Sequence, residues 1–160
     1  MPSLNNKAAL EKYLKTKLTP YIEVALEENV TPAVADVMGM KYEEKVASVY
    51  NPRIYERRGF DSGLADPDNI VGTTSGTTLT VENVTPFNQV YPTNNQGSGL
   101  AGLVEYGDGY GGHNYDYPTL DGAYMEPRPF IQATRDALAD GRIVKIALKN
   151  GLRKLGLSVE

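Results

Sequence analysis

The chain has 160 residues, no cysteine and no tryptophan, and its formal net charge is −4. The missing cysteines exclude disulfides, thiolate zinc sites and cysteine nucleophiles. A mildly acidic chain is unlike a free nucleic-acid-binding protein, which carries a basic excess. The length predicts one domain over residues 1–160. No apolar run approaches the roughly 20 residues of a membrane span, and the polar N-terminus predicts no secretory signal.

Residues 1–50 are predicted to be helical. Leu10, Leu14 and Leu18 are four apart and therefore share one face of a helix. Thr19-Pro20 and Thr31-Pro32 each join a capping residue to a proline. Because proline suits a first helical turn but disrupts a helix interior, both pairs predict a break or a kink.

Residues 51–106 are predicted to form strands and loops. Ile70–Thr74 and Thr77–Thr85 are strand candidates joined by a turn at Ser75-Gly76. Arg53–Arg58 is a candidate for an exposed, irregular strand, and Leu100–Tyr106 is the last strand candidate in the chain. Together they predict a small antiparallel sheet of three to four strands.

A loop rich in glycine and tyrosine, residues 107–128, separates the last predicted strand from a C-terminal helix at residues 129–156. Pro129 suits the start of that helix because its φ is already near the helical value. Asp140-Gly141 weakens the helix, since glycine costs about 1 kcal/mol in a helix interior. The predicted fold class is α+β, with N-terminal helices, a small antiparallel sheet and a C-terminal helix packed on the sheet.

Two segments of the chain match a known pattern. Val104-Glu105-Tyr106-Gly107 ends a predicted strand, and Arg128-Pro129-Phe130 opens a predicted helix. This pairing resembles the tail-completion or head–tail joining (neck) proteins of long-tailed bacteriophages, with Pro127 at the position of the family's alanine. Upstream, Tyr50–Arg57 is similar to the family's Tyr-x-Pro-x-x-Tyr-x-Arg segment.

The resemblance implies a structural virion protein at the head–tail interface, made in the host cytoplasm, rather than an enzyme. Such a protein forms a homo-oligomeric ring, a hexamer or a multiple, around the channel through which DNA leaves. It contacts neighbouring neck and tail proteins, lets DNA pass without sequence-specific binding, and needs no cofactor, metal or membrane. The residues predicted to hold the strand-to-helix corner, with Phe130 in the core, are Val104, Glu105, Tyr106, Gly107, Arg128, Pro129 and Phe130.

Two further groups of residues are candidates for partner contact. Tyrosines supply contact area at low entropic cost, and those of the loop are Tyr110, Tyr115, Tyr117 and Tyr124. A basic stripe on the C-terminal helix follows from a spacing of three, four and four, and consists of Arg142, Lys145, Lys149 and Arg153. The stripe is either a solvated helix face or a surface for an anionic partner, DNA or an acidic subunit edge.

The same loop leaves two other classes of function open. Carboxylates beside a histidine can bind a divalent ion or transfer protons, and the loop holds Asp108, His113, Asp116 and Asp121. These residues would make the chain a small hydrolase or a metal-binding protein. A nucleic-acid-binding module using the basic stripe is the other alternative.

Overall fold

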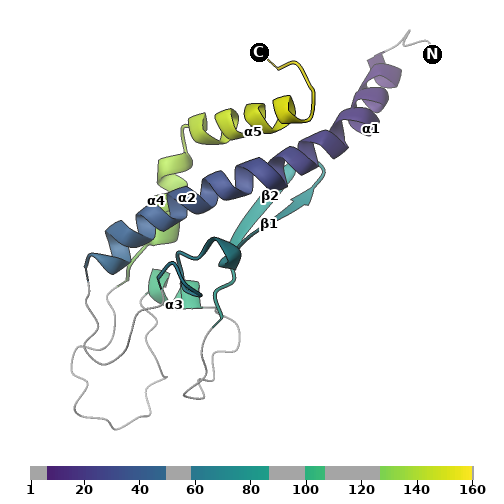
Figure 1. The fold of residues 1–160 in the computed structure, drawn as a ribbon. Helices are drawn as coiled ribbons and strands as arrows, with labels where there is room; N and C mark the ends of the chain where they lie inside the picture. The colour runs from purple at the N-terminus through teal and green to yellow at the C-terminus, as the bar shows by residue number, and fades with distance from the viewer. Residues whose placement is uncertain (1–6, 50–58, 87–99, 107–126, 160) are drawn as a thin grey trace, which may run out of the picture. The chain divides into compact units, whose positions relative to one another are not determined.

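The computed structural model describes residues 7–49, 59–86, 100–106 and 127–159 (Figure 1). The chain divides into two compact units. Unit 1 comprises Met1–Ala33, Gly72–Val81 and Gly141–Glu160, and unit 2 comprises Val34–Val71 and Glu82–Asp140. The expectation of one domain over residues 1–160 stays a prediction.

Residues 7–47 form a nearly continuous helical stretch, which confirms the predicted helical N-terminal region. Because Pro32 has no N–H and its ring clashes with a carbonyl one turn back, the helix widens at this point. The N–H of Thr31 donates to the carbonyl of Leu26, five residues earlier. The elements are α1 (Lys7–Ala25), the π-helical turn η1 (Leu26–Val30), α2 (Thr31–Tyr42) and a second π-helical turn η2 (Glu43–Ala47).

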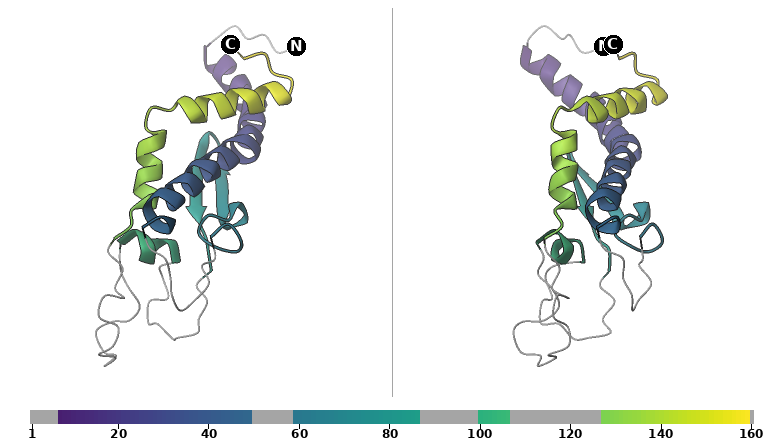
Figure 2. Two further views of the ribbon diagram at one scale, coloured as in Figure 1. Left: turned by 60° about the vertical axis from the view of Figure 1, so that its left-hand side comes forward. Right: turned by 90° about the vertical axis from the view of Figure 1, so that its left-hand side faces the viewer.

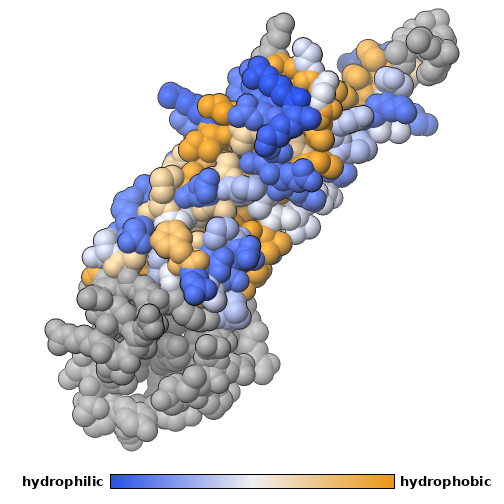
Figure 3. All heavy atoms as spheres, viewed as in Figure 1, coloured by the Kyte–Doolittle hydropathy of each residue, from blue (hydrophilic) through white to orange (hydrophobic). Residues whose placement is uncertain are grey.

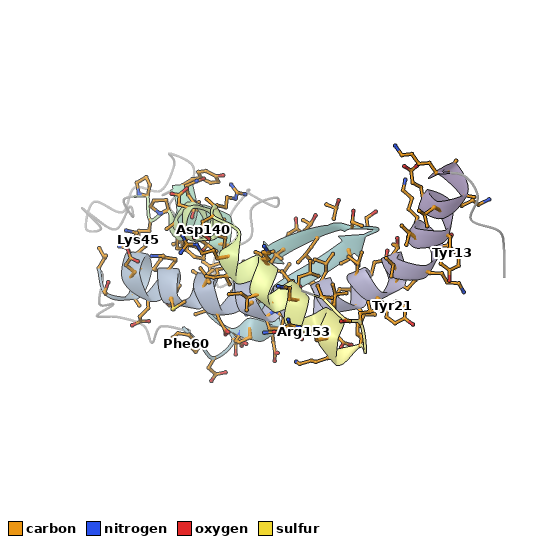
Figure 4. All side chains as sticks on the ribbon, turned by 90° about the horizontal axis from the view of Figure 1, so that it is seen from above. Tyr13, Tyr21, Lys45, Phe60, Asp140 and Arg153 are labelled. Atoms are coloured by element: carbon orange, nitrogen blue, oxygen red, sulfur yellow. The ribbon has the colours of Figure 1, made fainter. Side chains whose placement is uncertain are left out.

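Pro20 lies inside α1 and does not end it. A proline within a helix removes a hydrogen bond and kinks the axis. Figure 4 shows α1 bending between the labelled Tyr13 and Tyr21. The predicted kink is therefore present, and it sets off residues 7–17, called the arm below, from the rest of α1.

The predicted hairpin is confirmed. It consists of β1 (Ile70–Ser75) and β2 (Thr78–Asn83), and follows the short 3₁₀ turn η3 (Pro67–Asn69). Less exposed and more exposed positions alternate along both strands, as expected for a sheet with one face in water. Gly76 in the turn has a φ of 62°, which glycine adopts without a steric cost.

Leu100–Tyr106, predicted to be a strand, is the helix α3. Among its described side chains, those of Ala101, Val104 and Glu105 are buried, and these recur at helical spacing rather than at every second position. A short apolar run cannot be assigned by periodicity alone, and leucine, alanine and glutamate favour a helix. The prediction of three to four strands is corrected to two among the described residues, and Arg53–Arg58 lies outside them.

The predicted C-terminal helix is divided into α4 (Phe130–Leu138) and α5 (Arg142–Lys154). The division falls at Gly141, whose φ of 69° is incompatible with a continuing right-handed helix. The single helix predicted at residues 129–156 is predicted to pack on the sheet, and α5 is its second part. α5 packs chiefly on α1 and η1 instead, because Gly151 presents no side chain where the helices meet.

In unit 1, two carboxylates of the helical stretch tie down the hairpin. Glu23 accepts a hydrogen bond from the N–H of Gly76 (3.0 Å), and Glu27 accepts one from the hydroxyl of Thr74. Because the two glutamates are four residues apart, they lie on one face of the helical stretch. The hairpin and α5 therefore both depend on the segment around η1 for their position in this unit.

The core of unit 2 is centred on two aromatic rings. Tyr42 and Phe130 meet edge to face with ring centroids 6.2 Å apart, and Phe130 is 0% exposed. Figure 2 shows α3 beside the start of α4, the helix that Phe130 opens. Other buried apolar side chains of the unit include Val34, Val37, Met38, Val46, Leu64, Ile70 and Val104. The core position predicted for Phe130 is confirmed, as is the α+β class.

Candidate subunit and partner interface

Most of the loop predicted to grip partners, residues 107–126, lies outside the described residues. This applies to Gly107, to the contact tyrosines Tyr110, Tyr115, Tyr117 and Tyr124, and to the alternative cluster Asp108, His113, Asp116 and Asp121. Their roles stay predictions. Among the residues that the structure does describe, no group of three or more histidines or carboxylates is placed to hold a metal ion.

The predicted corner is a joint between two helices rather than between a strand and a helix. The N–H of Arg128 donates to the carbonyl of Val104 at 3.0 Å, which fixes the chain just before α4. The carboxylate of Glu105, only 7% exposed, accepts hydrogen bonds from the N–H groups of Ile131 (2.8 Å) and Gln132 (2.9 Å). The end of α3 therefore holds the beginning of α4.

Glu105 performs the task of a helix cap from a distance of 26 residues. The first N–H groups of a helix have no partner within it, and an anion is stabilised there by the helix dipole. Pro129, at the cap position of α4, makes no capping hydrogen bond with its side chain. Sequence reasoning missed this role, although the lack of a Ser, Thr, Asp or Asn before Phe130 was a signal that the cap comes from elsewhere.

The other corner residues divide between core and surface. Phe130 is 0% exposed and Val104 is 4% exposed, whereas Tyr106 is 69% exposed. Tyr106 is therefore available for contact with a partner and contributes little to the core.

The predicted basic stripe lies mostly on the surface of α5. Arg142, Lys145 and Arg153 are exposed and Lys149 is half-buried. Ile146, on the same side of the helix, is 59% exposed. Figure 4 shows the labelled Arg153 on α5, where its guanidinium donates to the carbonyl of Val159. The helix thus presents a basic surface with an apolar centre, which suits an anionic partner that also packs against it.

The opposite side of α5 is fastened to α1 and η1. A Cβ on Gly151 would lie 2.9 Å from the Cβ of Ala25 and 2.7 Å from the amide nitrogen of Asn29. The ammonium group of Lys154 donates to the side-chain oxygen of Asn29 at 3.0 Å. The missing side chain at Gly151 therefore sets the close approach that holds the basic stripe in place.

Replacing Gly151 by alanine is expected to destabilise the protein by about 1–3 kcal/mol, because the added methyl group overpacks this contact. Alanine is the better helix former by about 1 kcal/mol, so at a site with free space the same substitution would raise the stability. Thermal unfolding followed by circular dichroism measures the change. Asn150→Ala, at the exposed neighbouring position of the same helix, serves as the control and is expected to be neutral or stabilising. A gain of stability in Gly151→Ala would contradict the packing described here.

The arm is a second candidate surface, and sequence reasoning did not single it out. Leu10 and Leu14, predicted to belong to the apolar face of a helix, are 40% and 41% exposed. Their spacing was the available signal, but spacing does not show whether another part of the chain covers a face.

No helix among the described residues is long and apolar enough to cross a membrane.

Comparison with known proteins places the chain in a family. The YomN family model matches residues 6–154. The chain is 30% identical over 118 residues to the SPbeta prophage-derived uncharacterized protein YomN of Bacillus subtilis (strain 168), covering 73% of this chain and 71% of that protein. No solved structure matches the chain significantly. The prophage origin of this relative associates the family with bacteriophages. The chain therefore belongs to the YomN family.

Proposed function

We propose that this chain is a structural virion protein of a tailed bacteriophage that acts at the head–tail junction. It forms a homo-oligomeric ring, a hexamer or a multiple, around the DNA exit channel and joins the neighbouring neck and tail proteins. It has no catalytic role, and DNA passes the ring without sequence-specific binding.

The observation that carries this proposal is the corner of α3 and α4. The residues that resemble the neck-protein pattern form one structural joint, with Glu105 capping α4 and Phe130 in the core of unit 2. In this joint the motif residues stabilise the contact between two helices and do not form a catalytic site. This suits a structural subunit, because a subunit of a ring transmits load and needs no reacting groups. The prophage-derived relative supports the phage context of the proposal.

The described surfaces also suit a subunit with several partners. Tyr106, Ile146 and the arm leave apolar side chains exposed, and exposed apolar patches mark sites of protein interaction. The basic stripe adds a surface for an anionic neighbour. The net charge of −4 suits a channel wall, because each neutralised phosphate contact would slow the passing DNA.

Deleting the gene from the phage that carries it tests this proposal. The expected result is an accumulation of DNA-filled heads and separate tails in electron micrographs, with loss of infectious particles. The purified protein, added to a mixture of such heads and tails, should restore joined particles. Native mass spectrometry of the protein and of disassembled virions gives the copy number of the ring.

The control is the same deletion complemented by the intact gene in trans. Joined, infectious particles that form without the protein and do not contain it would refute the head–tail function. A catalysed reaction of a small molecule by the purified protein would favour the hydrolase alternative.

A further inference from the structure

The arm exposes an apolar stripe bordered by positive charge. Leu10, Tyr13 and Leu14 are 40%, 41% and 41% exposed, and their spacing places them on one side of α1. Four lysines and one glutamate give residues 7–17 a net charge of +3. Figure 3 shows apolar and hydrophilic residues side by side at this N-terminal part of α1.

This stripe continues the face by which α1 packs inside unit 1. Leu14, Leu18, Ile22 and Ala25 follow one another at spacings of four, four and three. Leu14 is 41% exposed, Leu18 and Ile22 are half-buried, and Ala25, where α5 packs, is 0% exposed. With 13 residues α5 is about 20 Å long, against about 29 Å for the 19 residues of α1. Among the described residues of unit 1, no other element lies beside the arm (Figure 4). In the part of unit 1 that the structure describes, the side chains of Leu10, Tyr13 and Leu14 are thus left exposed.

Charge is segregated between the two units. Unit 1 holds nine lysines and arginines against five carboxylates, a net charge of +4. Unit 2 holds seven against fifteen, a net charge of −8. Two copies of the chain therefore attract each other when unit 1 of one copy meets unit 2 of the other, and repel each other when like units meet.

Unit 2 offers a surface of matching chemistry on α2 and η2. Asp36, Met40 and Glu43 are spaced four and three, lie on one face and are all exposed, with Met40 61% exposed. Phe60, 61% exposed, lies near the same helix, since a Cβ on Gly39 would lie 3.4 Å from its ring. These four residues, Asp36, Met40, Glu43 and Phe60, are called the acceptor face: apolar side chains between carboxylates.

The positive charges next to the acceptor face are already engaged. Glu44 pairs with Lys41 at 2.6 Å and with Lys45 at 2.7 Å. These contacts, chiefly the hydrogen bond from Lys41, lower the pKa of Glu44 to about 2, so the carboxylate stays charged even at a pH where a free glutamate would be protonated. Lys41, Lys45 and Glu44 together carry a charge of +1, so Asp36 and Glu43, with −2, leave this region with a net charge of −1.

We propose that the arm of one copy packs against the acceptor face of a neighbouring copy, so that unit 1 of each copy contacts unit 2 of the next. Leucines of the arm would cover Met40 and Phe60, and Lys15 and Lys17, which follow the leucines in the sequence, would pair with Asp36 and Glu43. A heterologous contact of this kind closes into a ring when the rotation between copies permits. The inference rests on the ring proposed above and names the contact that builds it.

A second copy fits the arm better than other occupants do. A basic amphipathic helix is also typical of a membrane surface, but the rest of this chain carries a net charge of −7, which an anionic membrane or DNA would repel. DNA would also leave the leucines uncovered, because phosphate contacts use only the lysines. The continuity of the stripe with the α1–α5 contact indicates a protein partner.

A charge-swap experiment on the full-length chain tests the proposal. Variant 1 carries Lys15→Glu and Lys17→Glu, and variant 2 carries Asp36→Lys and Glu43→Lys. Each variant alone presents like charges at the contact, so its self-association is expected to weaken roughly 100-fold, about tenfold for each reversed position. An equimolar mixture restores opposite charges at every contact when the two variants alternate. It is expected to assemble at the same protein concentration as the wild type, into complexes with an even number of subunits. Native mass spectrometry and sedimentation velocity measure both effects.

Two matched variants separate this contact from general effects of charge and hydrophobicity. Arg135→Glu reverses a charge at an exposed position of α4, outside the arm, the acceptor face and the basic stripe, and is expected to leave association unchanged. Leu10→Gln with Leu14→Gln removes the apolar stripe without changing charge and keeps good helix formers. Its association is expected to weaken roughly 100-fold, because the contact no longer buries the apolar surface of two exposed leucines. Far-UV circular dichroism confirms that each variant is folded.

The possible outcomes are distinct. Rings that persist in variant 1, in variant 2 and in the leucine variant would overturn the arm contact while leaving the head–tail function standing. A wild-type chain that stays monomeric at high concentration would overturn it too, as would failure of the mixture to co-assemble. Binding of the wild type to phosphatidylserine vesicles or to duplex DNA, lost in the arm variants without a change in oligomeric state, would assign the arm to that partner instead.

Discussion

Replacing Phe130 by alanine is expected to lower the free energy of unfolding by about 3–5 kcal/mol. Phe130 is 0% exposed, and its ring meets the ring of Tyr42 edge to face. The substitution removes this contact and leaves a cavity, because a packed core relaxes only partly around a deleted side chain. Urea-induced unfolding followed by circular dichroism measures the loss.

Phe60→Ala provides the matched control for this experiment. Phe60 also meets Tyr42 edge to face, with ring centroids 6.5 Å apart, but it is 61% exposed. Its removal deletes an aromatic contact worth about 0.5–1.5 kcal/mol without opening a cavity. Equal losses in the two variants would show that the core of unit 2 is not built around Phe130.

Replacing Glu105 by glutamine is expected to cost about 1.5–3 kcal/mol, the range for hydrogen bonds to charged groups. The carboxylate accepts from two backbone N–H groups at the start of α4, those of Ile131 and Gln132. Glutamine has nearly the same shape but only one oxygen, so its amide group would face a backbone donor. The loss of the negative charge also removes a favourable interaction with the helix dipole.

Hydrogen exchange locates this effect. The amides of Ile131 and Gln132 are expected to exchange faster in Glu105→Gln, because local opening of the first turn becomes easier. Glu82→Gln, an exposed position on β2, makes the same chemical change and is expected to stay within about 0.5 kcal/mol of the wild type. Unchanged exchange at both amides would show that Glu105 does not hold α4.

The parts of the fold that local chemistry determines were predictable from the sequence. Leucines at helical spacing predicted the N-terminal helical region, and alternation around Ser75-Gly76 predicted the hairpin. The weak point at Asp140-Gly141 became the break between α4 and α5, since Gly141 adopts a left-handed conformation there.

The failures concern features that depend on partners distant in the sequence. Leu100–Tyr106 is too short and too apolar for periodicity to separate a strand from a helix, and the burial of Val104 and Glu105 in unit 2 decides for a helix. The capping role of Glu105 requires knowing that Ile131 lies beside it. The contact loop lies outside the described residues, so its predicted tyrosine contacts remain to be tested.

The wide turn η1 has a consequence for comparisons within the family. The N–H of Thr31 bonds to the carbonyl of Leu26, five residues earlier, whereas a bond to the fourth residue back would continue an ordinary helix. A homologue with one residue fewer here would present every later side chain of the helix rotated by about 100°. Alignments across residues 25–31 therefore need their gaps placed inside the turn, or buried and exposed positions will be exchanged along the whole of α2.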